Sequence, residues 1–326
     1  MMSQHPFDSD FRITSEQKFR FQRDGFVKLE GFLNANVIAA LLDRVDVEMG
    51  RSTLDNLKTN SLVNRTVYDF VRDKSEIFEL LERRYFRHAL TDLAERDLFF
   101  ISEQAFELEK NADKGLPWHV GVQVFGYQVA DEFGCTMWAP LHPVDADGQG
   151  GGMAYVPQHV VSGEFIFEQV DPAVISTFKA KEQAGVSTNV GEFWTVRNGI
   201  LNSSAMTEIL ETHRIEDDFE PGDVFLFNKN VVHRSAMLGE GPLARRAAYV
   251  MRFVDVGSRY NLEGAQNVEF PADLYSKGLF PYEGFTRQHI EIAEAGAVNG
   301  DLLAQCTYFD HRERRMLRRE QSPDGA

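Results

Sequence analysis

The spacing of apolar residues predicts helices in the first third of the chain. Thr14-Ser15-Glu16-Gln17 has the Thr-x-x-Gln form of a capping box, which predicts a short helix that ends near Arg23. Asn34 or Asn36 is a suitable N-cap for a second helix, and the apolar residues after it recur at helical spacing: Val37, Ile38, Leu41, Leu42 and Val45. A further helical set follows Ser75, namely Ile77, Phe78, Leu80, Leu81 and Tyr85. We expect these helices to pack against a sheet and to carry no chemistry.

Alternating and continuous apolar runs predict strands in the middle of the chain. The predicted strands are 26–29, 98–108, 122–129, 135–144, 152–156, 222–228 and 246–256. Turn residues separate them, including the glycine run 148–152 and the Pro-Gly-Asp turn 221–223. The glycine run precedes a strand, so it predicts a turn; a phosphate-binding loop would lead into a helix. Short strands without helices between them favour an antiparallel sandwich or barrel.

We interpret residues 1–326 as a single domain with four parts. These are a helical N-terminal part (14–96), a β core (97–256), an insertion in that core (160–218) and a C-terminal extension (257–326). The insertion interrupts the strand rhythm, which is typical of a lid or binding loop and also of a surface excursion. The charged segment 312–320 predicts a helix with a solvated face.

Composition and charge narrow the class of protein. The 43% hydrophobic and 26% charged content is ordinary for a globular protein, and the net charge of −16 disfavours nucleic-acid binding. Cys135 and Cys306 are too few for a disulfide framework, which indicates a reducing cytoplasm. The N-terminus lacks the pattern of a signal peptide, and no apolar run approaches the roughly 18 residues of a membrane span. A cytoplasmic enzyme or binding protein, with no membrane partner, is the expectation.

One histidine lies in an apolar stretch that is the first candidate for chemistry. His119 lies in the segment 117–127, and the residue two positions later is Gly121. In an extended strand these two positions face the same side. A common iron site places a histidine and a carboxylate at this spacing and takes a second histidine from elsewhere. Gly121 offers no carboxylate, so the site is either altered or absent.

The second candidate group follows a predicted buried strand. His233 comes after the segment 222–228, and Arg246 and Arg252 lie in the next apolar strand. Their separation of six is even, so both arginines lie on one face of that strand. Buried guanidinium groups need anionic partners. These partners could be protein carboxylates or a dianionic small molecule held bidentately by one arginine.

The order of these motifs resembles the phytanoyl-CoA dioxygenase-like enzymes. The matching residues are His119, the turn 148–152 with Tyr155, the turn 221–223, His233 and Arg246, together with the opening segment 22–27. The resemblance covers roughly residues 14–256 as an ordered set of motifs. It implies an iron(II)- and 2-oxoglutarate-dependent oxygenase on a double-stranded β-helix, a cupin-like jelly-roll barrel, with His119 and His233 as metal ligands.

Gly121 departs from the Asp that most of this family has in its His-x-Asp motif. The aliphatic halogenases, typified by the syringomycin-pathway chlorinase, have Gly or Ala there, and chloride occupies the vacated iron position. Thr136-Met137-Trp138 is also similar to the chlorinase sequence. The resemblance implies that Arg246 binds the distal carboxylate of 2-oxoglutarate, and that Thr136, Trp138 and Arg252 surround the halide and cosubstrate. Leu116 and the segment 157–159 do not match the expected pattern.

The charge of the proposed iron site explains why a glycine can be accommodated. Iron(II) with two neutral imidazoles and dianionic 2-oxoglutarate is formally neutral, and a halide adds the same charge as a carboxylate in less space. The resemblance then implies that O2 cleaves 2-oxoglutarate to succinate and carbon dioxide while a halogen is placed on an unactivated carbon. The protein contributes positioning and electrostatics.

Two other interpretations of Gly121 stay open. A third ligand could come from Asp145 or Asp147, which gives an ordinary hydroxylase, or the site could be inactive in a jelly-roll binding protein. Gln123, on the same face as Gly121, could also touch the site. The substrate is expected to be a small molecule, either free or tethered to a carrier protein. The acidic chain favours a free substrate because carrier proteins are usually acidic, although the basic segment 312–319 could reverse this locally.

Overall fold

The computed structural model describes residues 5–51, 65–68, 75–121, 125–188, 190–266 and 288–319. The first helix, α1 (Ser15–Asp24), begins at the predicted capping box: Thr14 Oγ1 accepts the N–H of Gln17, and the Gln17 side chain accepts the N–H of Thr14. It ends at Gly25, whose φ of 82° is accessible to glycine with little strain. The predicted strand follows as β1 (Phe26–Leu29).

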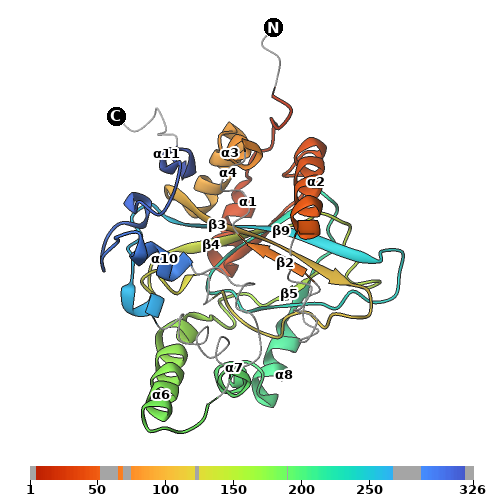
Figure 1. Cartoon of the computed structure of the whole chain (residues 1–326). Helices are drawn as coiled ribbons and strands as arrows, with labels where there is room; N and C mark the ends of the chain where they lie inside the picture. The colour runs from red at the N-terminus through yellow and green to blue at the C-terminus, as the bar shows by residue number, and fades with distance from the viewer. Residues whose placement is uncertain are drawn as a thin grey trace.

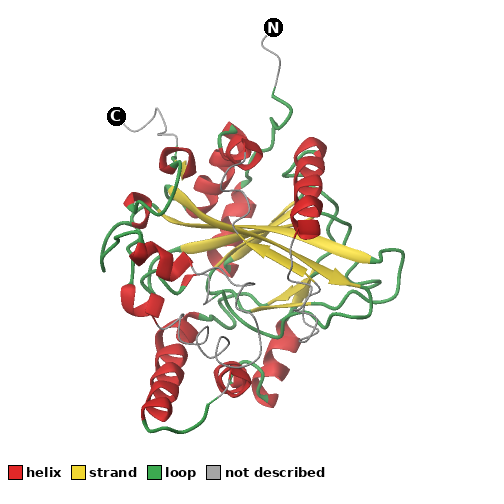
Figure 2. Ribbon diagram, in the orientation of Figure 1, coloured by secondary structure: helices red, strands yellow, loops and turns green. Residues whose placement is uncertain are grey.

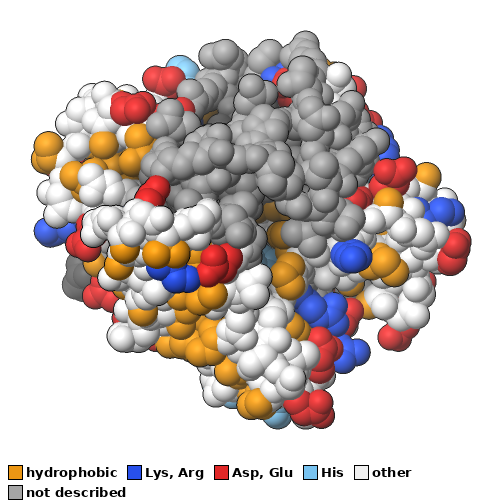
Figure 3. Space-filling model, turned by 60° about the horizontal axis from the view of Figure 1, so that its bottom comes forward, with side chains coloured by type: hydrophobic (Ala, Val, Ile, Leu, Met, Phe, Trp, Pro, Cys, Tyr) orange, Lys and Arg blue, Asp and Glu red, His pale blue; other side chains and the backbone are white. Residues whose placement is uncertain are grey.

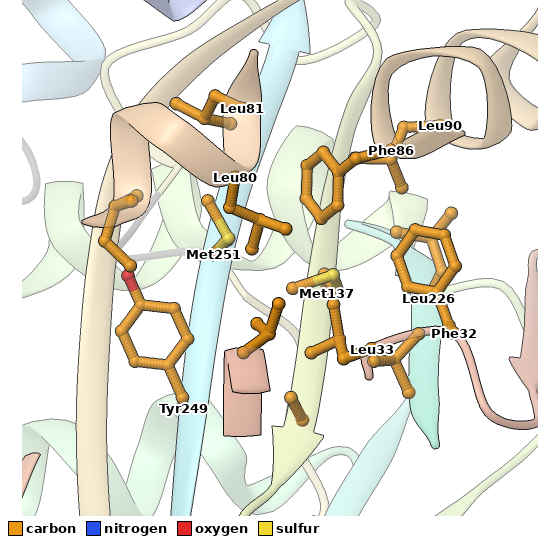
Figure 4. Close-up of a cluster of buried hydrophobic side chains, with 14 of the residues drawn as sticks. Phe32, Leu33, Leu80, Leu81, Phe86, Leu90, Met137, Leu226, Tyr249 and Met251 are labelled. Atoms are coloured by element: carbon orange, nitrogen blue, oxygen red, sulfur yellow. The ribbon is translucent and has the colours of Figure 1, made fainter. Parts of the chain in front are cut away.

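The remaining N-terminal helices form where the apolar spacing predicts them. Asn34 Oδ1 accepts the backbone N–H groups of Asn36 and Val37 and so caps α2 (Ala35–Arg51). The set after Ser75 is divided between α3 (Ser75–Leu81) and α4 (Arg84–Ala94). All three pack against one face of a sheet, as predicted (Figure 1). Figure 4 shows this contact, with Phe86 and Leu90 of α4 opposite Met137 and Met251 of the sheet.

The central sheet is antiparallel and contains most of the predicted strands (Figure 2). Its order is β1, β7 (Val224–Asn228), β4 (Gly134–Pro140), β9 (Arg245–Asp255), β3 (Leu98–Glu109) and β10 (Met316–Leu317), and β2 (Arg65–Tyr68) also pairs with β3. A second, smaller sheet has the order β6 (Ile215–Glu216), β5 (Met153–Tyr155) and β8 (His233–Ser235).

The two faces of the central sheet have different partners. Met137 and Met251 face the helices, whereas Trp138 and Val250, one residue away, belong to a second apolar cluster with Tyr155 of the smaller sheet. The ring of Tyr155 stacks on Phe225 of β7 with centroids 4.1 Å apart. The two sheets therefore face each other across an apolar interior, and the mainly antiparallel fold agrees with the sequence prediction.

The insertion 160–218 is helical apart from its connections and β6. It contains the π-helix η2 (Ile166–Val170), α6 (Asp171–Gln183), α7 (Val190–Gly199) and α8 (Ser204–His213). These helices lie at the end of the molecule opposite α2 and α3 (Figure 1). None of them was predicted from the sequence.

Two predictions about secondary structure are wrong. Residues 125–129, the described part of the predicted strand 122–129, form a turn held by Gln128, whose side chain donates to Phe133 O and Ser258 Oγ. The segment 312–320 was expected to be a solvated helix, but α11 (Arg312–Arg315) is one turn long and leads into β10. The C-terminal extension therefore adds a strand to the core, beyond α10 (Gln288–Glu294) and the 3-10 turn η4 (Leu303–Gln305).

In the part of the chain that the structure describes, no helix is both long enough and apolar enough to cross a membrane.

Candidate active site

His119 and His233 lie side by side on neighbouring strand segments. The N–H of each donates to the carbonyl oxygen of the other, at 2.9 and 3.0 Å, in an isolated antiparallel bridge. The ring centroids are 4.2 Å apart, and the ring planes are inclined by 51°. The structure thus brings together two histidines that are far apart in the sequence, at a separation that allows one ion to contact both.

Each imidazole is fixed by its own backbone. Nδ1 of His119 lies 2.7 Å from Pro117 O, and Nδ1 of His233 lies 2.9 Å from Val231 O. A carbonyl oxygen can only accept, so Nδ1 carries the proton in both rings and Nε2 keeps its lone pair. Metal-binding histidines usually have this arrangement, in which the second ring nitrogen is anchored by a carbonyl or carboxylate.

Burial keeps both rings neutral at neutral pH. It lowers the pKa of His233 to about 4 and lowers the pKa of His119 well below its usual value, with a further contribution from the neighbouring His233. A neutral imidazole is the form that binds a metal. The donor chemistry of the pair therefore fits a transition-metal ion such as iron(II).

Thr136 and Arg252 lie in one row across the central sheet, beside the histidines. The ring of His233 contacts Phe227 on β7 at a centroid distance of 4.8 Å. Phe227 pairs with Thr136 on β4, and Thr136 pairs with Arg252 on β9. The positive charge of Arg252 contributes, after burial, to the low pKa of His233. The Arg252 guanidinium donates to Gln104 Oε1 of β3.

Arg246 is fully buried, and its guanidinium has unused donors. Nε donates to Gly151 O at 2.5 Å, while Nη1 and Nη2 have no hydrogen-bond partner among the described residues. The group lies between the rings of Phe106 and Trp138, 5.3 and 5.5 Å from their centroids. The buried Trp138 Nε1–H also lacks an acceptor in the described structure. These donors fit an anionic ligand, because an unpaired buried charge is costly.

The charge on Arg246 persists at neutral pH. Burial lowers its pKa to about 9, which still leaves the guanidinium protonated at pH 7. As the even spacing predicts, Arg246 and Arg252 lie on the inner face of β9, with Ala248 and Val250 between them. A carboxylate of an exogenous molecule is the partner that this environment fits, since neither Asp nor Glu is paired with Arg246 in the described structure.

Gly121 lies in a bend two residues after the bridge at His119, so the extended strand on which residues 119 and 121 were expected to share one face does not include Gly121. The described residues contain no group of three or more His, Cys, Asp and Glu side chains that could hold a metal ion. Asp145 and Asp147 are exposed in the 145–150 turn, where Asp145 Oδ1 accepts the N–H of Gly148. The structure does not bring either carboxylate to the histidine pair. Gln123 lies outside the described residues.

Leu116 and the segment 157–159, which do not match the expected motif pattern, make hydrogen bonds or ion pairs with other parts of the chain. The carbonyl of Leu116 accepts the N–H of Ser235, beside the histidine bridge. The Gln158 side chain donates to Gln22 O, and His159 Nδ1 lies 3.0 Å from the Asp24 carboxylate. Gln158 and His159 therefore join the segment after the smaller sheet to the end of α1.

The insertion contributes residues that the sequence analysis missed. Asn202 donates to the carbonyl of Trp118, and Glu211 of α8 accepts from the Trp118 indole. Ser203 is the N-cap of α8, so the sequence contains a signal for the start of this helix. It contains no signal that Glu211 of the helix contacts Trp118. Figure 3 shows this end of the molecule, where apolar side chains gather on the surface, and exposed ones on the insertion include Val186, Val196, Ile200 and Ile209.

Comparisons with known proteins identify the fold. No protein-family model matches the sequence, and the search of curated proteins found no match. The solved structure of the epimerase SnoN from nogalamycin biosynthesis, in complex with Fe3+, alpha ketoglutarate and nogalamycin RO, has a TM-score of 0.55 at 16% identity and covers 93% of this chain and 98% of that chain. EctD from S. alaskensis with 2-oxoglutarate and 5-hydroxyectoine has a TM-score of 0.51 at 15% identity, covering 76% of this chain and 78% of that chain.

A third similar structure is the non-heme alpha ketoglutarate dependent carbocyclase SnoK from nogalamycin biosynthesis. Its TM-score is 0.50 at 14% identity, and the match covers 76% of this chain and 86% of that chain. Identities at this level show a shared fold and leave the activity to be argued from the site. The chain has the fold of non-heme iron, 2-oxoglutarate-dependent enzymes.

Proposed function

We propose that this protein is an iron(II)- and 2-oxoglutarate-dependent halogenase that installs chloride or bromide on an aliphatic carbon of a small molecule. We further infer that its two facing sheets are the halves of a double-stranded β-helix, the fold on which such oxygenases are built. The observation that carries the proposal is the histidine pair, with both Nδ1 atoms anchored and both Nε2 atoms available. Bound iron with O2 would supply the oxidative cleavage of 2-oxoglutarate and the activation of a carbon–hydrogen bond.

Arg246 and Trp138 would hold one carboxylate of 2-oxoglutarate. Both Nη atoms of Arg246 and the Trp138 indole N–H are buried donors without acceptors in the described structure, in the interior that also contains Phe227 beside His233. A bidentate carboxylate would satisfy the guanidinium and neutralise its charge. This would fix the cosubstrate in one orientation before O2 binds.

A halide would replace the carboxylate that the family has at position 121. The open position at Gly121, the Thr136 hydroxyl and the charge of Arg252 would together favour a small anion beside the histidines. Support comes from their positions in the sheet. Thr136 pairs with Arg252 on one side and with Phe227 on the other, and the Phe227 ring contacts His233. The residues present hold or attract the reactants, and we assign no proton transfer to them.

The substitution Gly121→Asp tests the halide position. A carboxylate there would add a metal ligand and exclude the anion, so we expect bromide anomalous scattering beside the histidines in anaerobic crystals of the natural protein and none in the variant. Both proteins should still form succinate from 2-oxoglutarate with iron(II) and O2. Bromide that persists at the same position in the variant, or halogenated product from it, would contradict the placement of the halide at position 121. Absence of both bromide and halogenated product from the natural protein would contradict the halogenase assignment.

The second candidate function is oxidation without halogen transfer. The similar structures include a carbocyclase, an epimerase and an enzyme crystallised with 5-hydroxyectoine, which favours this alternative. Succinate formation that is independent of halide, combined with bromide-free crystals, would support it. A catalytically inactive binding protein predicts binding of 2-oxoglutarate without any succinate.

We propose a free small molecule as the substrate. The arginines of the segment 312–319 are engaged within the chain: Arg314 pairs with Glu82, Arg318 with Asp97, and Arg319 donates to Glu95 O. This segment is therefore not a set of unpaired cations that could attract an acidic carrier protein. The net charge of −16 then disfavours such a partner.

A further inference from the structure

We infer that Glu211, on α8 of the insertion, is a positioning residue that holds the two histidine-bearing segments in the geometry needed to bind the metal. This inference rests on the proposed function, because it concerns the same metal site. It gives the insertion a role in the metal site, to which the proposed function assigns no residue of the insertion.

One carboxylate connects the immediate neighbours of both histidines. Glu211 Oε1 accepts from Trp118 Nε1–H at 3.0 Å and from Arg234 Nε–H at 3.2 Å. Oε2 accepts from Arg234 Nη2 at 3.4 Å. Trp118 directly precedes His119, and Arg234 directly follows His233. Glu211 therefore connects the two segments on the side of the bridge opposite the imidazoles, since neighbouring residues of a strand face opposite sides.

Trp118 and Arg234 also contact each other. The Arg234 guanidinium lies 5.2 Å from the centroid of the Trp118 ring. Trp118 is only 2% exposed, so its indole N–H needs an acceptor within the protein, and Glu211 is that acceptor. Apolar side chains complete the contact, with Leu210 of α8 in the same cluster as Trp118 and Val232.

Removal of the Glu211 carboxylate would weaken the connection between the two histidine-bearing segments without changing either of the proposed metal ligands, His119 and His233. The Trp118 indole would lose its acceptor, and Arg234 would lose one of its two carboxylate partners, because Glu216 also accepts from it at 3.0 Å. The two segments would keep their backbone bridge and the contact of Arg234 with the Trp118 ring, but not the carboxylate that fixes both side chains. Partners hydrogen-bonded directly to metal ligands typically affect metal affinity 10–100-fold, and Glu211, one residue removed from each ligand, should act at the lower end of that range. The expected effect is therefore a weaker metal site in a folded protein.

Titration with Co(II), followed by its visible absorption, measures this effect without turnover. We expect Glu211→Ala to weaken Co(II) binding about 10-fold and to change the band positions of bound Co(II). Glu211→Gln keeps an oxygen acceptor for the indole, so it should restore part of the affinity. Glu208→Ala is the matched control, because Glu208 is an exposed residue one turn earlier on α8. It should bind Co(II) like the natural protein.

A second variant keeps the test decisive if Glu211→Ala does not fold. Trp118→Phe removes the indole N–H and keeps an apolar ring, and its effect should be non-additive with that of Glu211→Gln. Unchanged Co(II) affinity and spectra in Glu211→Ala, or strictly additive effects in the double variant, would overturn the inference. A loss of stability alone would lower the melting temperature and leave the Co(II) bands in place.

The two proposals fail in different ways. If the natural protein does not bind Co(II), or if His119→Ala and His233→Ala bind it as well as the natural protein does, the proposed metal site is wrong and this inference falls with it. If the histidine variants lose Co(II) and Glu211→Ala does not, the metal site stands and the role of Glu211 is wrong.

Discussion

Arg246 places a positive charge in an apolar interior with two of its nitrogens unsatisfied in the described structure. Arg246→Met removes this charge and keeps much of the side-chain volume. Without ligand, we expect the free energy of unfolding of the variant to exceed that of the natural protein by about 1 kcal/mol or more, because the cost of the buried charge disappears. In the constant presence of redox-inert Mn(II), 2-oxoglutarate at one hundred times its dissociation constant should stabilise the natural protein by about 2.7 kcal/mol. The variant should gain nothing from 2-oxoglutarate.

The neighbouring arginine provides the control for that experiment. Arg245 points to the other side of β9 and pairs with Asp46 and Glu107. Arg245→Met should lower the free energy of unfolding, since Glu107 is left buried without this partner. It should still be stabilised by 2-oxoglutarate. Urea denaturation with and without the cosubstrate measures both quantities, and a ligand response in Arg246→Met would contradict the assignment.

Lys229, on the turn between β7 and β8, gives a pH-dependent prediction. Burial lowers its pKa from 10.5 to about 8, against the opposing effect of the acidic side chains around it: Glu132, Asp131, Glu164 and Glu168. Between pH 8 and 10.5 the unfolded chain keeps this proton and the folded protein has lost it, so stability rises with pH across that window. Relative to Lys229→Met, the natural protein should gain about 3 kcal/mol from pH 8 to 10.5. Parallel stability profiles of the two proteins would contradict the depressed pKa.

At the scale of single residues, the sequence predicted positions better than partners. The even spacing of Arg246 and Arg252 placed both on the inner face of β9, because strand alternation is a local property. Nothing local indicated that Gln104 would accept from Arg252 or that Glu211 would accept from Trp118. Those contacts depend on how distant segments pack, which one sequence does not reveal.

Among the elements, α6 and α7 of the insertion are joined by a buried ion pair. Asp171 and Arg197 are 7% and 6% exposed, and Arg197 Nε donates to Asp171 Oδ1 at 2.9 Å. Burial raises the pKa of Asp171 despite this partner, so the pairing does not fully offset the desolvation of the carboxylate. We expect Asp171→Leu to lower the free energy of unfolding by about 3–5 kcal/mol, because it leaves Arg197 buried without that carboxylate.

The double variant Asp171→Leu with Arg197→Met separates two effects. One is the loss of the interaction between the two side chains, and the other is the cost of leaving the Arg197 charge buried without the Asp171 carboxylate. Replacement of both charges by apolar groups should recover most of the stability lost in the single variant. Urea denaturation measures the free energies, and hydrogen exchange would locate the change in α6 and α7. A double variant as unstable as Asp171→Leu would show that the pair is needed for the packing of the two helices.

The insertion and the segment 125–129 show why some elements were not predicted. The sequence of α7 contains two glycines and no continuous apolar stripe, so the helix depends on contacts such as that of Phe193 with Phe178 of α6. In residues 125–129, the apolar run favoured a strand, but Tyr127 O accepts from Asn261 and Gln128 donates to Ser258. In both cases tertiary contacts outweigh the local preference. By contrast, the helices α1 to α4 carry their caps or apolar spacing in the sequence, and they were predicted.

For the whole molecule, the strand order of the central sheet explains how the site is supported. The strands that carry Thr136, Arg246 and Arg252 lie in the middle, while β1 from the start of the chain and β10 from its end lie on opposite sides of them. Phe26 pairs with Phe227 and Leu98 with Leu317, each across about two hundred residues of sequence. Strands from both ends of the described chain therefore form the two edges of the sheet and keep β4 and β9, which carry site residues, in its interior.

This arrangement predicts that a change far from the site will unfold the site with the rest of the sheet. Leu317 is fully buried at the edge, and Leu317→Ala should lower the free energy of unfolding by about 2–5 kcal/mol. Arg318→Ala, next in sequence and exposed, should change it by less than about 0.5 kcal/mol. Because the sheet is continuous from β1 to β10, the urea midpoints followed by far-UV circular dichroism and by Co(II) absorption should fall together in Leu317→Ala. If the Co(II) midpoint stays in place while the dichroism midpoint falls, the site is held by the insertion and the smaller sheet alone.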